Sequence, residues 1–392
     1  MKKGLWLLPM VIAAYAYGRP PAEDSLKTER PKFVSLQIAD GFVAPTSRIR
    51  KDAKIAPHLT AFSLKYGVMA NGDKWEDYYY GMPYKGFGVY KPFFTKCEEI
   101  GNPFSVFLFQ GATLKEFGDR LSLDYEINLG VSFNWNHYDA VRSPDFLVTG
   151  SSINAHLAGD LFLRQKISDH FDLLYGINVS HFSNGSTRTP NYGINPLSAY
   201  VEVAYNINGR RKLAEKIAPP DNFEKRRIHD FSVFVTGRTV SLDTTGTQLR
   251  LRFPKQYFTV AGISYNYMFH SLRSLLWGPG IDLVYDEGNR VGIVSDSSSD
   301  AEYNGVVQLA KLSDRFQAGL SIKGEVLMPG YSIFMSLGYD IIHANNKDER
   351  LYQNYGIKIR LFDGLYTSLG VRSTELTHSR FLYVNLGYTF GR

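Results

Sequence analysis

The sequence predicts an all-β fold, a transmembrane antiparallel β-barrel of the outer membrane with about 16 strands. Three observations predict it: a signal-like N-terminus, the lack of any later run of about 20 apolar residues, and a composition rich in aromatic residues and glycine. The chain has 26 Tyr, 26 Phe and 35 Gly among 392 residues, which suits short alternating strands flanked by aromatic girdles. On composition alone, a large soluble all-β domain is the alternative.

The N-terminus has the pattern of a secretory signal peptide. Two lysines precede an apolar stretch from Leu5 to Ala14, and the small residues Ala14 and Ala16 form an A-x-A cleavage pattern. We therefore expect a signal peptide over residues 1–16 and a mature chain that begins near Tyr17. The apolar stretch is too short to cross a bilayer as a helix, and no later run reaches the roughly 20 residues required.

Strict alternation of apolar and polar residues identifies the strands. Residues 121–134 show it most clearly, because every second side chain is apolar and the side chains between are polar or small. Successive side chains of a strand point to opposite faces, so the apolar row predicts a lipid-facing surface. That row is Leu121, Leu123, Tyr125, Ile127, Leu129, Val131 and Phe133.

Similar segments recur along the whole chain. They lie at residues 33–43, 58–69, 78–90, 103–113, 151–165, 170–183, 195–207, 228–240, 256–268, 275–286, 315–327, 331–341, 351–362, 365–375 and 381–390. Together with 121–134 they give about 16 strands, although 12 or 14 would also fit weak single-strand signals. The last segment has an apolar row that ends at Phe390, similar to the signal that marks bacterial outer-membrane proteins for assembly, with Gly391 and Arg392 after it.

Two local matches indicate an internal duplication. Residues 171–175 (FDLLY) resemble 362–366 (FDGLY), and residues 200–205 (YVEVAY) resemble 383–388 (YVNLGY), in the same order. Chance similarity among barrel strands is the alternative. The sequence does not decide between one large barrel and two small ones in tandem.

We expect four parts of the chain, which are a signal peptide (1–16), a first barrel half (17–208), a charged periplasmic connection (209–227) and a second barrel half (228–392). The charge run from Arg210 to Arg227 is better explained by a solvated connection than by a nucleic-acid site. Cys97 is the only cysteine, so an intrachain disulfide is excluded.

A candidate site appears where polar side chains break an apolar row. The outward row of one strand runs from Phe171 to Val179, and continuing by twos places His181 and Ser183 on the same row. In the next strand, stepping back by two from the apolar Leu197 reaches Asn195. If the two strands pair as an antiparallel hairpin, Asn195 stands beside His181 on the outside of the barrel. Nucleophile, base and orienting group would then share one face.

A His-x-Ser pair alone is weak evidence, because most such pairs are ordinary strand-end residues. The surrounding motif is more specific. His181-Phe182-Ser183-Asn184-Gly185 and the following 190–195 (PNYGIN) resemble the active-site segment of the lipid A 3-O-deacylase family, the PagL-like acyloxyacyl hydrolases. The resemblance is strong over residues 171–207, plausible over the first half and at best faint over the second.

The resemblance implies an outer-membrane barrel that hydrolyses the ester-linked acyl chain at position 3 of lipid A on its outer surface. It implies His181 as general base and Ser183 as nucleophile. The third member departs from the family, which has a Glu where this chain has Asn195. Glu202 does not replace it readily because its phase is inward, whereas the Asn195 carbonyl can accept the imidazole N–H without contributing a negative charge.

Outer-membrane phospholipase A also resembles this segment, with a His-x-Ser-Asn-Gly motif and an Asn as third member. That alternative would imply a phospholipid substrate, calcium and dimerisation, although no acidic loop cluster in the sequence demands calcium. A porin-like or structural barrel with a vestigial motif is the non-enzymatic alternative, since an eight-stranded barrel would suffice for the deacylase.

Several loop residues are candidates for binding substrate. Asn184 or the backbone N–H of Gly185 could stabilise an oxyanion, and Asn191 could help position substrate. The turn preferences of Asn and Gly explain the same residues without any function. Arg188 could meet a lipid phosphate, or could be an ordinary loop charge.

The other histidines lack the spacing of a metal site, and no phosphate-binding glycine loop occurs, so zinc and nucleotide chemistry find no support. We expect no cofactor and no nucleic-acid partner. The sequence therefore predicts a serine esterase of the outer membrane of a Gram-negative cell, acting on lipid A or, alternatively, on a phospholipid. Its oligomeric state is not determined by the sequence.

Overall fold

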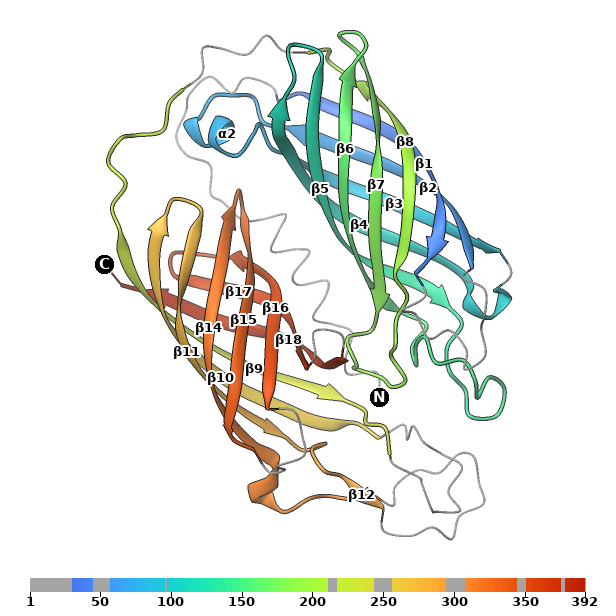
Figure 1. Ribbon diagram of the computed structural model, residues 1–392, viewed down its shortest axis with the longest axis vertical. Coiled ribbons are helices and arrows are strands. Elements are labelled where there is room, and N and C mark those ends of the chain that lie inside the picture. The colour runs from blue at the N-terminus through green and yellow to red at the C-terminus, as the bar shows by residue number, and fades with distance from the viewer. Residues whose placement is uncertain are drawn as a thin grey trace. The chain divides into compact units, whose positions relative to one another are not determined.

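The computed structural model describes residues 30–44, 57–95, 97–210, 217–242, 256–293, 307–343, 350–374 and 378–391. The expected signal peptide lies outside the described residues. The described chain forms two compact units, and each is built around a closed barrel of eight antiparallel strands (Figure 1). Two barrels of eight, rather than one barrel of 16, resolve the alternative that the sequence left open.

The first barrel contains the strands in chain order, and its last strand pairs with its first. Its strands are β1 (Lys32–Val43), β2 (His58–Met69), β3 (Tyr84–Thr95), β4 (Gly101–Glu116), β5 (Leu121–Trp135), β6 (Asn154–Lys166), β7 (Phe171–Ser183) and β8 (Pro196–Asn206).

The second barrel has the same up-and-down order, and β18 closes it against β9. Its strands are β9 (Arg226–Arg238), β10 (Phe258–Leu272), β11 (Leu275–Asp286), β14 (Phe316–Met328), β15 (Tyr331–Ile342), β16 (Leu351–Arg360), β17 (Leu365–Thr374) and β18 (His378–Phe390). The remaining elements are short: β12 (Gly292–Ile293) pairs with β13 (Val307–Gln308), and single helical turns lie at α2 (Trp75–Tyr79), η1 (Glu98–Ile100) and η2 (Leu312–Arg315).

All 16 expected strands are present, within a few residues of the expected bounds. The clearest error concerns the segment 78–90, whose first residues belong to α2 and to the turn after it, so that β3 begins only at Tyr84. The turn contains Gly81 and Met82, both with positive φ (73° and 55°), a conformation that ends regular structure. Aromatic residues such as Tyr78–Tyr80 suit a strand as well as a helix, and this made the sequence signal ambiguous.

The alternation of the sequence appears in the barrel wall as an apolar outside and a polar inside. Along β7 the outward side chains of Phe171, Tyr175, Ile177 and Val179 are exposed, whereas Asp172, Leu174 and Asn178 between them are buried. Exposed apolar rows of this kind are stable only against lipid.

Ion pairs occupy the interior of both barrels. In the first barrel the Lys65 ammonium lies 2.9 Å from a Glu126 carboxylate oxygen and 2.8 Å from one of Glu202. In the second, Lys323 and Lys358 lie 2.8 and 3.1 Å from the carboxylate of Asp230. Eight strands leave an interior only wide enough for side chains, so these groups fill the space that a porin would leave open.

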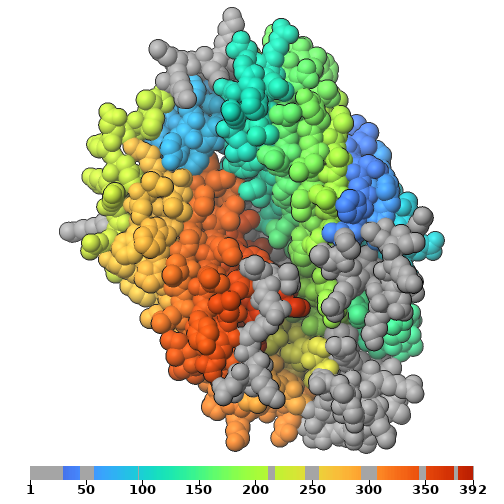
Figure 2. All heavy atoms as spheres, viewed as in Figure 1, coloured from blue at the N-terminus to red at the C-terminus, as the bar shows by residue number. Residues whose placement is uncertain are grey.

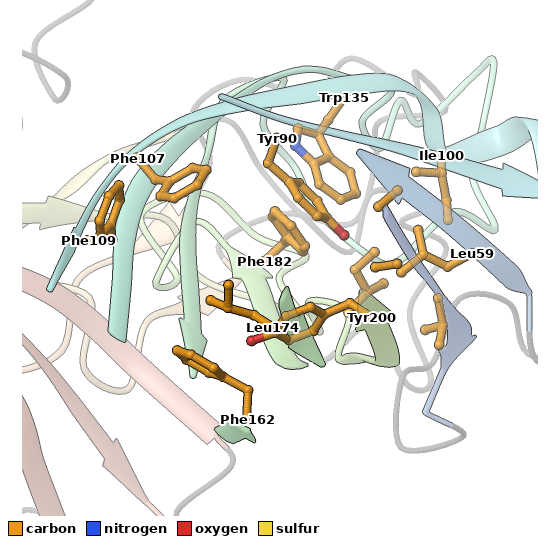
Figure 3. Packing of buried hydrophobic residues seen from close by; sticks show 14 of the residues in the cluster. Leu59, Tyr90, Ile100, Phe107, Phe109, Trp135, Phe162, Leu174, Phe182 and Tyr200 are labelled. Carbon is orange, nitrogen blue, oxygen red and sulfur yellow. The ribbon is translucent and has the colours of Figure 1, made fainter. Parts of the chain in front are cut away.

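An aromatic cluster fills the end of the first barrel nearest to the end of β7. Phe182 is 1% exposed, and its ring centroid lies 5.2 Å from Trp135 and 4.5 Å from the buried His156. Figure 3 shows Phe182 pointing into the barrel among Tyr90 and Trp135. The backbone at the end of β7 is thus anchored from inside.

The strand register sets the tilt of the first barrel. Following paired residues once around the wall from Ser183, through β6, β5, β4, β3, β2, β1 and β8, leads back to β7 at Leu173, which is 183 − 173 = 10 residues away. A shift of ten residues over eight strands corresponds to a strand tilt of roughly 40°.

The two barrels have the same strand order, and their pairing shows that one of the two local sequence matches is misaligned. Phe171, the first residue of β7, pairs with Tyr205, and Leu365, the first residue of β17, pairs with Tyr388. Phe171 therefore corresponds to Leu365, three residues beyond the Phe362 that the sequence match suggested. The second match, 200–205 with 383–388, is in register.

Candidate functional site

The candidate site lies on the outward row of β7, where the sequence placed it. His181 and Ser183 are half-buried and follow the exposed Val179 on the same face, while Phe182 between them points inward. Strands β7 and β8 face the viewer in Figure 1, and Figure 2 shows their outer surface in green.

The pairing of β7 with β8 brings Asn195 opposite His181. The ladder joins Val179 to Leu197, and the bridge from Phe182 to Ile194 keeps the same register, because both pairs sum to 376. His181 and Asn195 share this sum. Phe182 and Ile194 exchange two backbone hydrogen bonds of 3.0 Å, so the adjacent pair of His181 and Asn195 is of the non-hydrogen-bonded type, in which side chains stand closest.

Three side chains form a continuous relay. Asn195 Oδ1 lies 2.6 Å from His181 Nδ1, and His181 Nε2 lies 2.8 Å from Ser183 Oγ. An amide oxygen only accepts, so Nδ1 must carry the imidazole hydrogen, which leaves Nε2 as the acceptor for the Ser183 hydroxyl. This is the tautomer that a serine nucleophile requires of its base.

Small residues flank Ser183 on both sides, one on β6 and one in the segment that leads into β8. Ala155 of β6 is its pairing partner on one side, and Gly193, which has the same register sum, lies opposite on the other. Gly193 has φ 66°, and a Cβ there would lie 3.2 Å from His181 Cε1, 3.2 Å from Ser183 Cβ and 2.8 Å from the Phe182 carbonyl oxygen. The absence of a side chain at Gly193 therefore leaves room for the relay.

The loop residues from the sequence analysis take different positions. Asn184 is 6% exposed, and its side-chain Nδ2 donates to Thr149 Oγ1 at 3.1 Å, while its backbone N–H donates to Asn191 Oδ1 at 2.8 Å. Both groups thus hold the loop in place, and a role of Asn184 in stabilising an oxyanion stays a prediction. Asn191 supports the backbone beside Ser183.

Gly185 follows with φ 60°, and among the described residues no acceptor takes its backbone N–H. Its role in stabilising an oxyanion stays a prediction. Arg188 is half-buried in the same loop, and its contact with a lipid phosphate stays a prediction.

Sequence reasoning missed Thr149 and underestimated Gly193. Thr149 lies in the β5–β6 loop, 34 residues before Ser183, and no periodicity or motif connects the two. Gly193 carried a readable signal, because its register places it opposite Ser183, although turn chemistry explained it equally well.

The described residues contain no helix that is long and apolar enough to cross a membrane. Within the same part of the chain, no group of three or more His, Cys, Asp or Glu side chains could hold a metal ion.

The fold and the lipid-facing rows define the class: an outer-membrane protein made of two closed β-barrels. A more particular assignment comes from its second half, since residues 229–392 match the family model described as acyloxyacyl hydrolase, C-terminal domain. Residues 229–392 are thus similar to the acyloxyacyl hydrolases, the family that the motif at residues 181–195 also resembles. The match covers the half in which the sequence showed at best a faint resemblance.

Solved structures with similarity to the chain are outer-membrane proteins. The outer-membrane enzyme PagL shares 17% identity at a TM-score of 0.30, over 43% of this chain and 97% of PagL. The alcaligin receptor FauA of Bordetella pertussis shares 12% at a TM-score of 0.26, over 93% of this chain and 65% of the receptor. The siderophore receptor PirA of Pseudomonas aeruginosa shares 11% at a TM-score of 0.25, over 93% and 81%. No curated protein matches the chain.

The family match and the candidate site fall in different barrels. Residues 229–392 contain no His-x-Ser sequence. Counting from the first strand residue, as from Phe171 to His181 and Ser183, the second barrel has Glu375 and Thr377 at the corresponding places, which lie outside the described residues. The His-x-Ser motif of the candidate site thus occurs in the first barrel and not in the part of the chain that the family model matches.

Proposed function

We propose that the protein is an outer-membrane serine esterase that hydrolyses an ester-linked acyl chain of lipid A, with Ser183 as nucleophile. The observation that carries the proposal is the relay of Ser183, His181 and Asn195 on a row of side chains that otherwise faces lipid. Hydrolase activity agrees with the acyloxyacyl hydrolase family of the second half.

The relay is suited to acyl transfer. As Ser183 Oγ attacks the ester carbonyl, its proton passes to His181 Nε2, and Asn195 holds the ring through Nδ1. The oxyanion that develops on the carbonyl oxygen can be met by the backbone N–H of Gly185, a kind of contact that contributes about 3 to 4 kcal/mol where measured. His181 then returns the proton to the departing sugar oxygen, and water hydrolyses the acyl-enzyme in the reverse sense.

The lengths of the connections favour an outer-leaflet position for the site. In the first barrel, residues 117–120 and 167–170 form short turns at the end opposite the site, whereas 136–153 and 184–195 form long connections at the site end. Two connections depart from this pattern: 70–83, which contains α2, is long, and 96–100, which contains η1, is short and lies at the site end. Outer-membrane barrels have short periplasmic turns and longer extracellular loops, so Ser183 would meet lipids of the outer leaflet by lateral diffusion.

Lipid A is the substrate we propose because the segment 181–195 resembles the deacylases. A phospholipid is the second candidate, favoured by one observation: Asn195 occupies the place of the third member, as the Asn does in outer-membrane phospholipase A. Calcium and dimerisation belong to that second candidate. The filled interiors of both barrels argue against a porin.

The test is mass spectrometry of lipid A and phospholipids from outer membranes that contain the wild-type protein or Ser183→Ala. Loss of one hydroxyacyl chain from lipid A with the wild type only is the expected result. Lysophospholipid instead would assign a phospholipase, and unchanged lipids with both proteins, each folded by heat-modifiable migration, would contradict the esterase.

A further inference from the structure

The β5–β6 loop is bound to both sides of the β7–β8 loop. On one side, Gly193 N–H donates to the Val148 carbonyl at 2.9 Å, and Tyr192 N–H donates to the Leu147 carbonyl at 3.3 Å. On the other, Thr149 Oγ1 receives the side chain of Asn184 at 3.1 Å. Three consecutive residues, Leu147 to Thr149, thus contact the backbone opposite Ser183 and the residue directly after it.

The Thr149 hydroxyl uses its full hydrogen-bonding capacity. It is 1% exposed, accepts from Asn184 Nδ2 and from Ser151 N–H at 3.1 Å, and lies 2.8 Å from Asn154 Oδ1 and 3.2 Å from the Ser151 carbonyl, which are acceptors for its single hydrogen. A hydroxyl offers one donor and two acceptor sites. A buried group satisfied in this way fixes its partners, because a rearrangement would leave a polar atom unpaired.

The position of Asn184 decides where the next peptide points. Its backbone N–H is held by Asn191 and its side chain by Thr149, so the residue from which the peptide to Gly185 extends is fixed by two hydrogen bonds. The hydrogen of that peptide is the Gly185 N–H, which no acceptor among the described residues takes. Thr149 acts on this donor only through Asn184.

We infer that Thr149 is a positioning residue of the esterase, which holds Asn184 so that the Gly185 N–H is aimed at the carbonyl oxygen of the scissile ester. This inference rests on the proposed function and adds to it a residue from a different loop. A donor that is preorganised for the transition state affects kcat, whereas one that only shapes a binding surface affects KM.

The experiment compares Thr149→Val with Thr149→Ser in the purified full-length protein, with lipid A in detergent micelles as substrate. Valine keeps the shape and removes the hydroxyl, and serine keeps the hydroxyl. We expect Thr149→Val to lower kcat by about 10- to 100-fold with KM within about twofold, and Thr149→Ser to stay within about threefold of the wild type. Labelling of Ser183 by a fluorophosphonate should slow in parallel, since this reaction builds a similar oxyanion.

Ser63→Ala is the matched control. Ser63 is a buried hydroxyl of the same barrel that donates to the Gln37 side-chain oxygen at 2.9 Å and has no connection to the site, so its loss should leave kcat unchanged. Activity is referred to the folded fraction measured by electrophoresis without boiling, and Thr149→Ala replaces valine if valine prevents folding.

Wild-type kcat in the valine variant, an equal loss in the serine variant, or a change confined to KM would each overturn the inference. Its failure differs from failure of the proposed function. In the first case Ser183→Ala is inactive while Thr149→Val is normal, and in the second Ser183→Ala and the wild type release the same lipids.

Discussion

Asn195 supplies an acceptor where the deacylases that its segment resembles have a carboxylate. Its oxygen fixes the tautomer of His181 at a distance of 2.6 Å, but it adds no charge to stabilise the imidazolium that forms when Ser183 loses its proton. Asn195 can therefore orient the His181 ring as a Glu would, but it cannot stabilise the imidazolium by charge. Substitutions at position 195 can separate these two effects.

Asn195→Ala should lower kcat by about 10- to 100-fold, because His181 loses the acceptor that orients it. Asn195→Asp keeps the acceptor and adds a charge, so its kcat should equal or exceed that of the wild type. Steady-state hydrolysis by the folded variants measures both. Activity of Asn195→Ala within twofold of the wild type would show that Asn195 is not part of the relay.

Gly193→Ala should reduce activity by at least about tenfold while the barrel still forms. A Cβ at this position meets the Phe182 carbonyl, the His181 ring and Ser183 Cβ, and the φ of 66° is unfavourable for alanine. The measurement is the rate of fluorophosphonate labelling of Ser183, with heat-modifiable migration as the folding control. Gly159→Ala is the matched variant, since a Cβ at Gly159 meets nothing within 4 Å, and it should label at the wild-type rate.

Phase arithmetic predicted the core of the site because β-strands have a fixed period. Counting by twos was sufficient to place His181, Ser183 and Asn195 on one face. The antiparallel register of β7 and β8 then placed Asn195 opposite His181. Loop residues have no period. For this reason the sequence did not predict the hydrogen bonds of Asn184 to Asn191 and Thr149, and Thr149 was not found at all.

At the scale of elements, the end of β7 is held between lipid outside and an aromatic cluster inside. Phe182 is the inward anchor, and its neighbours in the chain are His181 and Ser183 of the candidate site. Phe182→Ala should destabilise the first barrel by about 3 to 5 kcal/mol through the cavity that it leaves.

Urea unfolding in micelles or vesicles, followed by electrophoretic migration, measures this loss. Phe162→Ala is a useful comparison, since Phe162 is also buried in the first barrel, at 3% exposure, but lies on β6. Equal destabilisation by both, with activity lost only in Phe182→Ala, is the expected pattern. A Phe182→Ala protein of full stability would contradict the anchoring role.

Strands were predictable one by one, but their closure was not. The hydropathy pattern of each strand is local, and it located all 16. Closure depends on which strand pairs with β1. Pairing with β8 closes a barrel of eight strands and pairing with the last strand closes a barrel of 16, but both bury the same rows of side chains, so the hydropathy pattern does not distinguish them. The alignment of Phe171 with Phe362 was wrong by three residues for a similar reason, because only the strand pairing shows that residues 362–364 form a turn and that the strand begins at Leu365.

For the whole molecule, the closure of each barrel on itself predicts that the chain can be divided. Residues 217–221 are exposed and carry no strand. Two co-expressed fragments, cut within this segment and each given its own signal peptide, should each form a heat-modifiable barrel, and the first should retain Ser183 labelling. A first fragment that folds only when the second is present would show that the barrels depend on one another.

The pairings of β1 with β8 and of β9 with β18 also bear on how such a chain can change over generations. A wall that needs no strand from its neighbour tolerates mutation in that neighbour. In a chain of two such barrels, one can keep its chemistry under selection while the other drifts toward a different use without exposing a strand edge.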